Sequence, residues 1–267
     1  MSHDPVTEYT IRGGSADADR LARQAEVMAA ASLSFLAECG AGPGAAVLDV
    51  GCGDGQIAHA LARRGGVVVG IDIDPDAVAI ARRTRDGADF RVQDAAVPAG
   101  RDEFDLACSR LLLSHLVDPM AVVRAMCAAV RPGGVVAVED LFSPTLGGEP
   151  HVPALTELAE VYSATVRSHG GDPAIGPRLA THLRAAGLVD VTEHTVVNRM
   201  TEPHEKRFLV QLLDNMRPAI LAAGVADDSR LTRLRAEVSA AAARPDVTFL
   251  QARMHQVAGR RPGLQTG

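Results

Sequence analysis

The sequence predicts an α/β fold built on a doubly wound, mostly parallel sheet. Three observations support that prediction. Short apolar runs rich in valine recur along residues 47–140 and alternate with segments of helical pattern. A glycine-rich turn joins the first of these runs to a helix. The chain has 267 residues, of which 47% are hydrophobic, and this is enough for one large core.

The first strand and its turn occupy residues 47–55, which read Val-Leu-Asp-Val-Gly-Cys-Gly-Asp-Gly. Glycines at Gly51, Gly53 and Gly55 allow a tight turn, positive φ angles and a close approach of a ligand to the backbone. The dinucleotide fingerprint G-x-G-x-x-G would place its third glycine where this chain has Gln56. The turn therefore predicts a nucleoside-containing cofactor, with a spacing that departs from the dinucleotide pattern.

Residues 49–55 match motif I, E/D-x-G-x-G-x-G, at every fixed position. In this the chain resembles the class I S-adenosylmethionine (SAM)-dependent methyltransferases. The resemblance implies SAM as the cofactor, bound in part by Asp49, Gly51, Cys52 and Gly53. It also implies a Rossmann-like sheet of seven strands whose last strand is antiparallel, with helical N-terminal and lid insertions.

A second strand is expected over residues 67–72, where a run of valines ends on a carboxylate. Asp72 lies 21 residues after Gly51, and Rossmann-like sites bind the ribose hydroxyls with an acidic residue about 20 residues beyond the glycine turn. We therefore assign Asp72 to the ribose, with Ile73 beside it in the cofactor site. Asp74 precedes a proline and is interpreted as the N-cap of the next helix.

A third strand over residues 89–93 leads to Asp94 and Ala95. This pair is similar to the acidic-Ala step of the family, in which the carboxylate accepts a hydrogen bond from the adenine amino group. A fourth strand over residues 104–110 ends at Arg110, which the resemblance places at the cofactor.

A helix is expected over residues 120–130, and the Arg-Pro-Gly-Gly turn at 131–134 leads into a fifth strand over 135–140. This turn is a second mark of the same family. Five landmarks in the family's order, spread over about 95 residues, are more specific than any one of them.

Candidate general bases should lie at the carboxyl ends of the fourth and fifth strands, because open α/β sheets bind ligands there. His115, Glu139 and Asp140 meet that condition. An imidazole accepts a proton near neutral pH, but a histidine beside an apolar run is often hydrogen-bonded scaffold. The two carboxylates have the alternative of capping a helix or facing solvent. The sequence leaves the identity of the base open.

No metal site is predicted. Metal-dependent members of the family group carboxylates after the fourth and fifth strands, and Arg110 stands where the first would be expected.

Residues 1–40 are expected to form an N-terminal helical cap, and residues 41–267 the methyltransferase domain. Within the cap, a helix is expected from about residue 16 to residue 39 because an apolar stripe recurs at helical spacing. Tyr9 is expected to fold over the cofactor, as an N-terminal tyrosine does in similar methyltransferases.

The remaining elements follow the family's order. They are helices over 152–169 and 175–186, a sixth strand near 189–192, a lid insertion of two helices over about 202–242, and a last strand from 248 to about 257.

Composition limits the partners. The net charge of −6 and eight aromatic residues give no basic face with stacking platforms, so nucleic acid is not expected as a substrate. No apolar run approaches 18 residues and no leader pattern is present, so we expect a cytoplasmic protein without a membrane anchor. Four cysteines without a C-x-x-C pair are expected to be reduced.

These observations predict a methyltransferase that moves the methyl group of SAM to an oxygen, nitrogen or carbon of a small, biosynthetic, secondary metabolite. The small-molecule substrate is the expected partner, and a homodimer is a further possibility. Two alternatives stay open: an NAD(P)-dependent oxidoreductase, which the glycine spacing disfavours, and a catalytically silent scaffold of the same fold, which the intact motif I disfavours.

Overall fold

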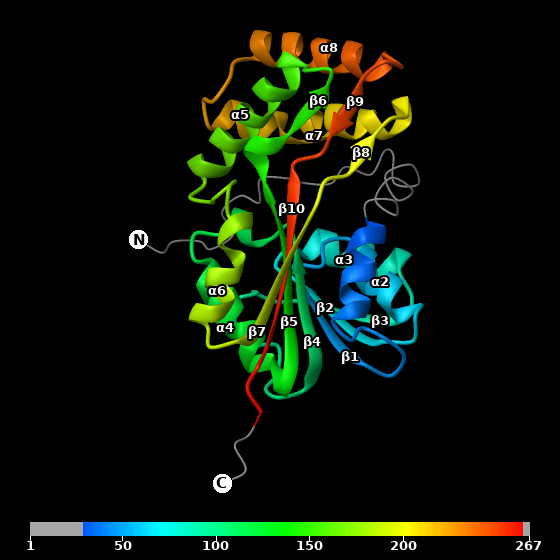
Figure 1. The fold of residues 1–267 in the computed structure, drawn as a ribbon, viewed down its shortest axis with the longest axis vertical. Coiled ribbons are helices and arrows are strands. Elements are labelled where there is room, and N and C mark those ends of the chain that lie inside the picture. Colours follow the sequence, from blue (N-terminus) through cyan, green and yellow to red (C-terminus); the bar gives the residue numbers. More distant parts are fainter. Residues whose placement is uncertain (1–28, 264–267) are drawn as a thin grey trace.

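A seven-stranded sheet in the order β3-β2-β1-β4-β5-β10-β7 forms the centre of the protein (Figure 1). The computed structural model describes residues 29–263. The strands are β1 (Ala46–Val50), β2 (Val67–Asp72), β3 (Ala88–Val92), β4 (Phe104–Arg110), β5 (Val130–Phe142), β7 (Val189–Val196) and β10 (Arg253–Arg260). β10 runs antiparallel to both of its neighbours, whereas the other pairs are parallel. The predicted Rossmann-like fold class is confirmed.

Helices cover both faces of this sheet. One face carries the helical residues 29–38 with α2 (Gln56–Ala62) and α3 (Pro75–Thr84), and the other carries α4 (Pro119–Ala129) and α6 (Leu179–Ala185). Along β1, Val47 packs into the first layer, while Leu48 and Val50 pack into the second. Successive side chains point to opposite faces of a strand, so a strand covered on both faces is mostly apolar. In β1 the exception is Asp49.

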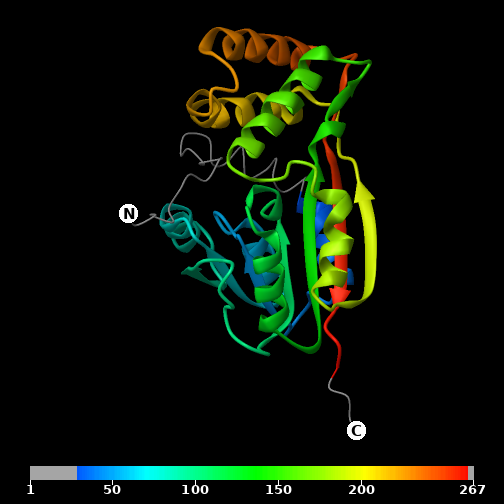
Figure 2. The same ribbon diagram turned by 90° about the vertical axis from the view of Figure 1, so that its left-hand side faces the viewer.

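A second layer stands beyond the carboxyl ends of the parallel strands, at one end of the sheet (Figure 2). It contains α5 (Pro153–Ser168), α7 (Pro203–Ala222) and α8 (Asp228–Ala243), with a small antiparallel sheet of β6 (Gly147–Glu149), β9 (Thr248–Leu250) and β8 (Arg199–Met200). Phe249 and Leu155 are fully buried in its apolar core. We call this layer the lid.

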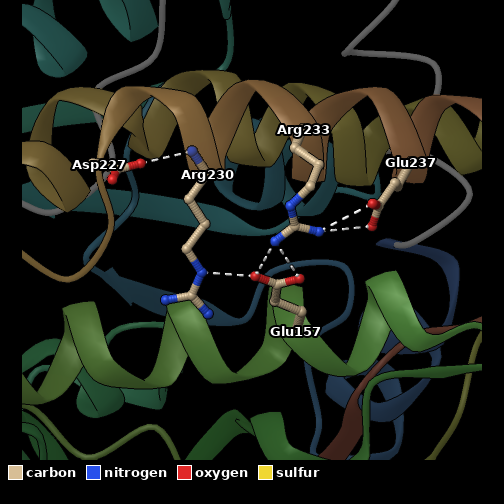
Figure 3. A network of polar contacts seen from close by, with 5 residues as sticks. All are labelled: Glu157, Asp227, Arg230, Arg233 and Glu237. Atoms are coloured by element: carbon tan, nitrogen blue, oxygen red, sulfur yellow. Dashed lines mark hydrogen bonds and ion pairs between the residues drawn. The ribbon is translucent and has the colours of Figure 1, made fainter.

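Ion pairs join two of the lid helices (Figure 3). Glu157 on α5 accepts from Arg230 Nε at 2.7 Å and from Arg233 Nη2 at 2.9 Å, both on α8. Arg233 also pairs with Glu237 one turn along, and Asp227 caps α8 by accepting from the Arg230 backbone. Exposed ion pairs each contribute little to stability, so the apolar core is what stabilises the lid. The ion-pair network sets how α5 lies against α8.

The structure corrects one expected boundary. The predicted last strand, 248–257, is two strands in different sheets, because the chain leaves the lid at Gln251, whose backbone donates to the Asn198 carbonyl. α5 buries its apolar face in the same core as the two helices of the expected insertion over 202–242, and the bounds of that insertion stay a prediction.

The N-terminal helix is described from residue 29 onward. Of the predicted helix 16–39, residues 29–38 are helical and share the core of the sheet, and residues 16–28 lie outside the described part. The domain boundary at residue 40 stays a prediction.

Short 3-10 turns complete the fold at η2 (Leu113–His115), η3 (Ser143–Thr145) and η4 (Gly176–Arg178).

Candidate functional site

The glycine turn after β1 has the geometry that its sequence predicted. Gly51, Gly53 and Gly55 have φ angles of 73°, 54° and 79°. A Cβ at Gly55 would lie 2.5 Å from Phe90 Cζ, and one at Gly51 would lie 2.9 Å from a methyl of Leu112. A Cβ at Gly53 would meet nothing within 4 Å among the described residues. Gly51 and Gly55 thus let Leu112 and Phe90 pack against the turn, whereas Gly53 leaves its backbone open to a ligand.

Asp72 binds the same turn from the end of β2. Its Oδ2 accepts from Gly53 N at 2.8 Å, its Oδ1 accepts from Asp74 N at 2.9 Å, and the residue is 5% exposed. A carboxylate has about four acceptor positions, so two remain for ribose hydroxyls. Asp74 accepts from Asp76 N and caps α3, which confirms the predicted N-cap.

The other cofactor candidates from the sequence lie at the next strand ends. Ile73 follows β2 and is 44% exposed. Gln93 N donates to the Asp72 carbonyl, which brings the end of β3 beside that of β2. Asp94 is exposed and accepts from Ala96 N at 2.8 Å, and Ala95 is partly buried. These residues therefore gather at the carboxyl ends of β2 and β3, and their contact with a cofactor stays a prediction.

The remaining cofactor candidates differ in their surroundings. Cys52 is buried with its pKa raised by burial, and the four cysteines at 39, 52, 108 and 127 are free thiols, as predicted. Tyr9 lies outside the described residues.

Asp49 is buried at 3% exposure behind the glycine turn. The Cys108 thiol lies 3.9 Å from its Oδ1, and its Oδ2 has no hydrogen-bond partner among the described residues. Burial, which disfavours the charged form, raises the pKa of Asp49 to about 7.

We expect Asp49→Asn to stabilise the protein at alkaline pH. Between pH 3.8 and about 7 the folded state binds more protons than the unfolded state, so stability falls as pH rises through this window and is lowest above it. Removing the charge should increase the free energy of unfolding by about 2–4 kcal/mol at pH 8 and change it little near pH 4. Urea unfolding across this pH range measures the effect. The exposed control Asp89→Asn should show the same pH dependence of stability as wild type. If Asp49→Asn did so too, the raised pKa of Asp49 would not be the cause of that dependence.

A buried polar network lies where β4 and β5 end. Ser32 Oγ accepts from Arg110 Nε at 3.0 Å and donates to Glu139 Oε2 at 2.9 Å, and Gln256 Nε2 donates to the same oxygen at 2.8 Å. Burial raises the pKa of Glu139, against the opposing effect of the Gln256 hydrogen bond and the Arg110 charge.

Asp140 is fully buried and engaged by backbone groups. Its Oδ2 accepts from Ser114 N at 2.9 Å, its Oδ1 accepts from Leu141 N at 2.8 Å, and burial raises its pKa to about 6. The contacts of Glu139 and Asp140 thus assign both carboxylates to holding the walls of the site. Their candidacy as general bases stays a prediction.

His115 ends η2, the turn that Asp140 holds through Ser114. Its Nε2 lies 3.5 Å from the Tyr162 hydroxyl of α5. Burial is the main cause that lowers the pKa of His115 to about 4, so the imidazole is neutral at pH 7 and is harder to protonate there than in water.

A cavity of about 450 Å³ connects the glycine turn to the lid. Gly53, Arg110 and His115 line its sheet side, and side chains of α5 and α7 line its lid side. The described residues of this lining include leucines, a phenylalanine and neutral amides, with Asp54 and Arg110 as charged groups.

Sequence reasoning missed the individual lid residues of this wall. They are Tyr162 from α5 and Phe208, Gln211, Leu212 and Asn215 from α7. The α7 residues recur at spacings of three and four, which places them on one face of the helix. Two amides on an otherwise apolar helical face were the sequence pattern that could have indicated a binding wall.

Comparison with known proteins identifies the family. A family model described as methyltransferase domain matches residues 21–193. The chain belongs to the methyltransferase-domain family. The predicted family and its cofactor, SAM, are confirmed.

Relatives of this methyltransferase include ubiquinone biosynthesis O-methyltransferases. The one from Xanthomonas campestris is 34% identical over 160 residues, covering 58% of this chain and 65% of the relative. The one from Xanthomonas axonopodis is 38% identical over 157 residues, covering 54% and 63%. The matches thus span just under two thirds of the length of these curated relatives.

Solved structures show the fold of the methyltransferase. A putative methyltransferase from Bacillus halodurans has a TM-score of 0.57 at 17% identity, covering 86% of this chain and 98% of that chain. A phosphoethanolamine N-methyltransferase from Haemonchus contortus, in complex with S-adenosylhomocysteine (SAH), has a TM-score of 0.51 at 19% identity, covering 83% and 49%. At these identities the likeness concerns the fold alone.

Two kinds of feature are absent from residues 29–263 of the methyltransferase. No helix in this part is both long and apolar enough to span a membrane. In the same range, no group of three or more His, Cys, Asp or Glu side chains is placed to hold a metal ion.

Proposed function

We propose that the protein transfers the methyl group of SAM to a hydroxyl oxygen of a small, largely apolar and neutral molecule. The observation that carries this proposal is the cavity, which extends from the open backbone of Gly53 to an apolar wall of lid residues. Such a cavity is within the size range of small-molecule sites. The O-methyltransferase names of the relatives support oxygen as the acceptor atom.

The residues present fit SAM at this site. Gly53 leaves room for close approach, and Asp72 retains acceptor positions for two hydroxyls. When bound, SAM supplies an electrophilic methyl group on a sulfonium whose leaving group is neutral SAH. The task of the protein is then alignment, which can contribute on the order of 7–11 kcal/mol.

His115 is the proposed general base. As the oxygen–carbon bond forms and the sulfur–carbon bond breaks, the hydroxyl becomes strongly acidic, so an imidazole whose pKa is lowered by burial can still take its proton. Tyr162 lies close enough to orient the ring. Leucines of the lid exclude water from this region and contact the apolar part of the acceptor. The products of the transfer are a methyl ether, SAH and a proton.

A methyl-transfer assay tests this function. Purified protein is incubated with methyl-labelled SAM and a matched panel of apolar phenols, primary amines and polyanionic phenols, with SAH and NADH binding measured by calorimetry in parallel. We expect SAH binding and label on the neutral phenols. Binding of NADH alone would favour an oxidoreductase, and SAH binding without transfer to any class would favour a silent scaffold.

A further inference from the structure

Gln251 lies where the chain crosses from the lid to the main sheet. It stands between β9 and β10, and Asn198 stands between β7 and β8, where the chain crosses in the other direction (Figure 1). The Gln251 backbone donates to the Asn198 carbonyl at 2.9 Å, and Asn198 Nδ2 donates to Gln251 Oε1 at 2.7 Å. These two hydrogen bonds fix both the backbone and the side-chain amide of Gln251.

The other end of this amide is left to the cavity. Gln251 lines the cavity and is 5% exposed. Because Asn198 binds its oxygen, the end that remains is Nε2, which carries two N–H donors. Nε2 donates to no residue within 29–263. A buried donor without a partner is costly, so an amide held in this way at a cavity indicates a ligand atom that accepts from it.

A second polar side chain lies in the same wall. Ser143 follows the end of β5, lines the cavity and is 4% exposed, and its hydroxyl makes no hydrogen bond to the described residues. Its turn is joined to the chain beside Gln251, because Arg253 N donates to Thr145 Oγ1 at 2.7 Å. This side of the cavity therefore presents two hydrogen-bonding groups to a ligand.

The charges around the cavity favour a neutral group at this point. The charged residues of the lining, Asp54 and Arg110, belong to the glycine turn and to the end of β4. The lining residues from the lid helices and from the segments beside Gln251 carry no charge. An anion here would lose its hydration without a cation as its partner. A neutral oxygen, such as that of a ketone, accepts from an amide without this cost.

We propose that Gln251 is a specificity-determining residue whose Nε2 donates to a neutral carbonyl oxygen of the methyl acceptor, and that Asn198 is its positioning residue. This inference rests on the proposed function, because it takes a small molecule methylated in this cavity as the ligand. His115, the proposed base, lines the same cavity. The substrate class then narrows to hydroxyl compounds that carry a ketone away from the hydroxyl that is methylated.

Binding of three matched phenols to the protein with SAH tests this inference. Each phenol carries, on the same saturated spacer, a cyclopentanone, a cyclopentane or a pyrrole ring, so the first ring accepts a hydrogen bond, the second does neither and the third only donates. We expect wild type to bind the cyclopentanone phenol about 5- to 50-fold more tightly than the other two in calorimetry. In methyl transfer from SAM, the preference should appear in KM with kcat nearly unchanged.

Two variants of the amide pair should give opposite results. Gln251→Met keeps the length of the side chain without its donors, so the preference for the cyclopentanone phenol should fall to within about twofold. Asn198→Asp replaces the donor to Gln251 Oε1 by an acceptor. The Gln251 amide should then turn over, present Oε1 to the cavity and favour the pyrrole phenol. Damage to packing alone would weaken all three phenols and reverse no preference.

Thr145→Val is the matched control at the same crossing. It removes the hydroxyl that accepts from Arg253 N, and Thr145 does not line the cavity. The variant should therefore lose stability in thermal unfolding but keep the wild-type preference among the three phenols.

Equal binding of the three phenols by wild type, or tighter binding of the pyrrole phenol, would overturn the inference, and methyl transfer to these phenols would leave the proposed function intact. An unchanged preference in Gln251→Met would overturn it as well. Should Gln251→Met fail to fold, Asn198→Asp decides, since an unchanged preference there contradicts the role of the amide pair. If wild type bound SAH but neither bound nor methylated any of the phenols, the proposed function would fall and this inference with it.

Discussion

Replacing Gly53 by alanine is expected to weaken SAH binding by about 10- to 100-fold while the protein stays folded, because overpacking a contact costs about 1–3 kcal/mol. The φ angle of 54° admits an alanine at modest strain, and the new Cβ meets no described atom within 4 Å. The methyl group would project into the space that a cofactor occupies. Calorimetric titration with SAH, beside thermal unfolding, measures both effects.

Two other glycines make this prediction specific. Gly44→Ala places the same methyl group at a φ angle of 79°, also in open space but away from the cavity, and should bind SAH as wild type does. Gly55→Ala would put its Cβ 2.5 Å from the Phe90 ring and should lose stability instead. Wild-type affinity in Gly53→Ala would show that no ligand approaches this backbone.

His115→Ala should lower kcat by about 10²- to 10⁴-fold, the usual contribution of a general base. The expectation depends on a neutral hydroxyl acceptor, from which a proton must leave as the methyl group arrives. The affinity for SAH should remain within about threefold of wild type, because the proposed cofactor contacts at Gly53 and Asp72 belong to other strand ends. Single-turnover transfer of labelled methyl, with the acceptor found in the assay above, measures the rate.

The matched control is His204→Ala, since His204 is exposed near the start of α7 and does not line the cavity. It should retain wild-type kcat. A kcat for His115→Ala within threefold of wild type would assign His115 to a structural role beside Tyr162, which was the alternative that the sequence left open.

Much of the cofactor side could be predicted because it depends on local chemistry. The positive φ angles at Gly51, Gly53 and Gly55 and the N-cap at Asp74 are properties of a few consecutive residues. The place of Asp72 beside the turn follows from the rule that neighbouring parallel strands end at the same edge. The hydrogen bond between Asp72 and Gly53 could not be anticipated from spacing.

The surroundings of the catalytic candidates could not be predicted, because they depend on contacts between distant segments. Glu139 and Asp140 are adjacent in sequence at the end of β5, and both looked available to a substrate. Ser32 and Gln256 lie 107 and 117 residues from Glu139, yet both donate to its side chain, and Asp140 is used by the backbone of the His115 turn.

The amino-acid sequence by itself therefore determined the fold class, the family and the cofactor, and it predicted the strand ends at which the cofactor would lie. Periodicity and turn chemistry act over a few residues, so they can be read along the chain. Only the tertiary structure decided that α5 and α7 close the cavity, that Glu139 lies behind Arg110, and that His115 faces Tyr162. Such contacts depend on how layers pack in three dimensions, and no local pattern encodes them.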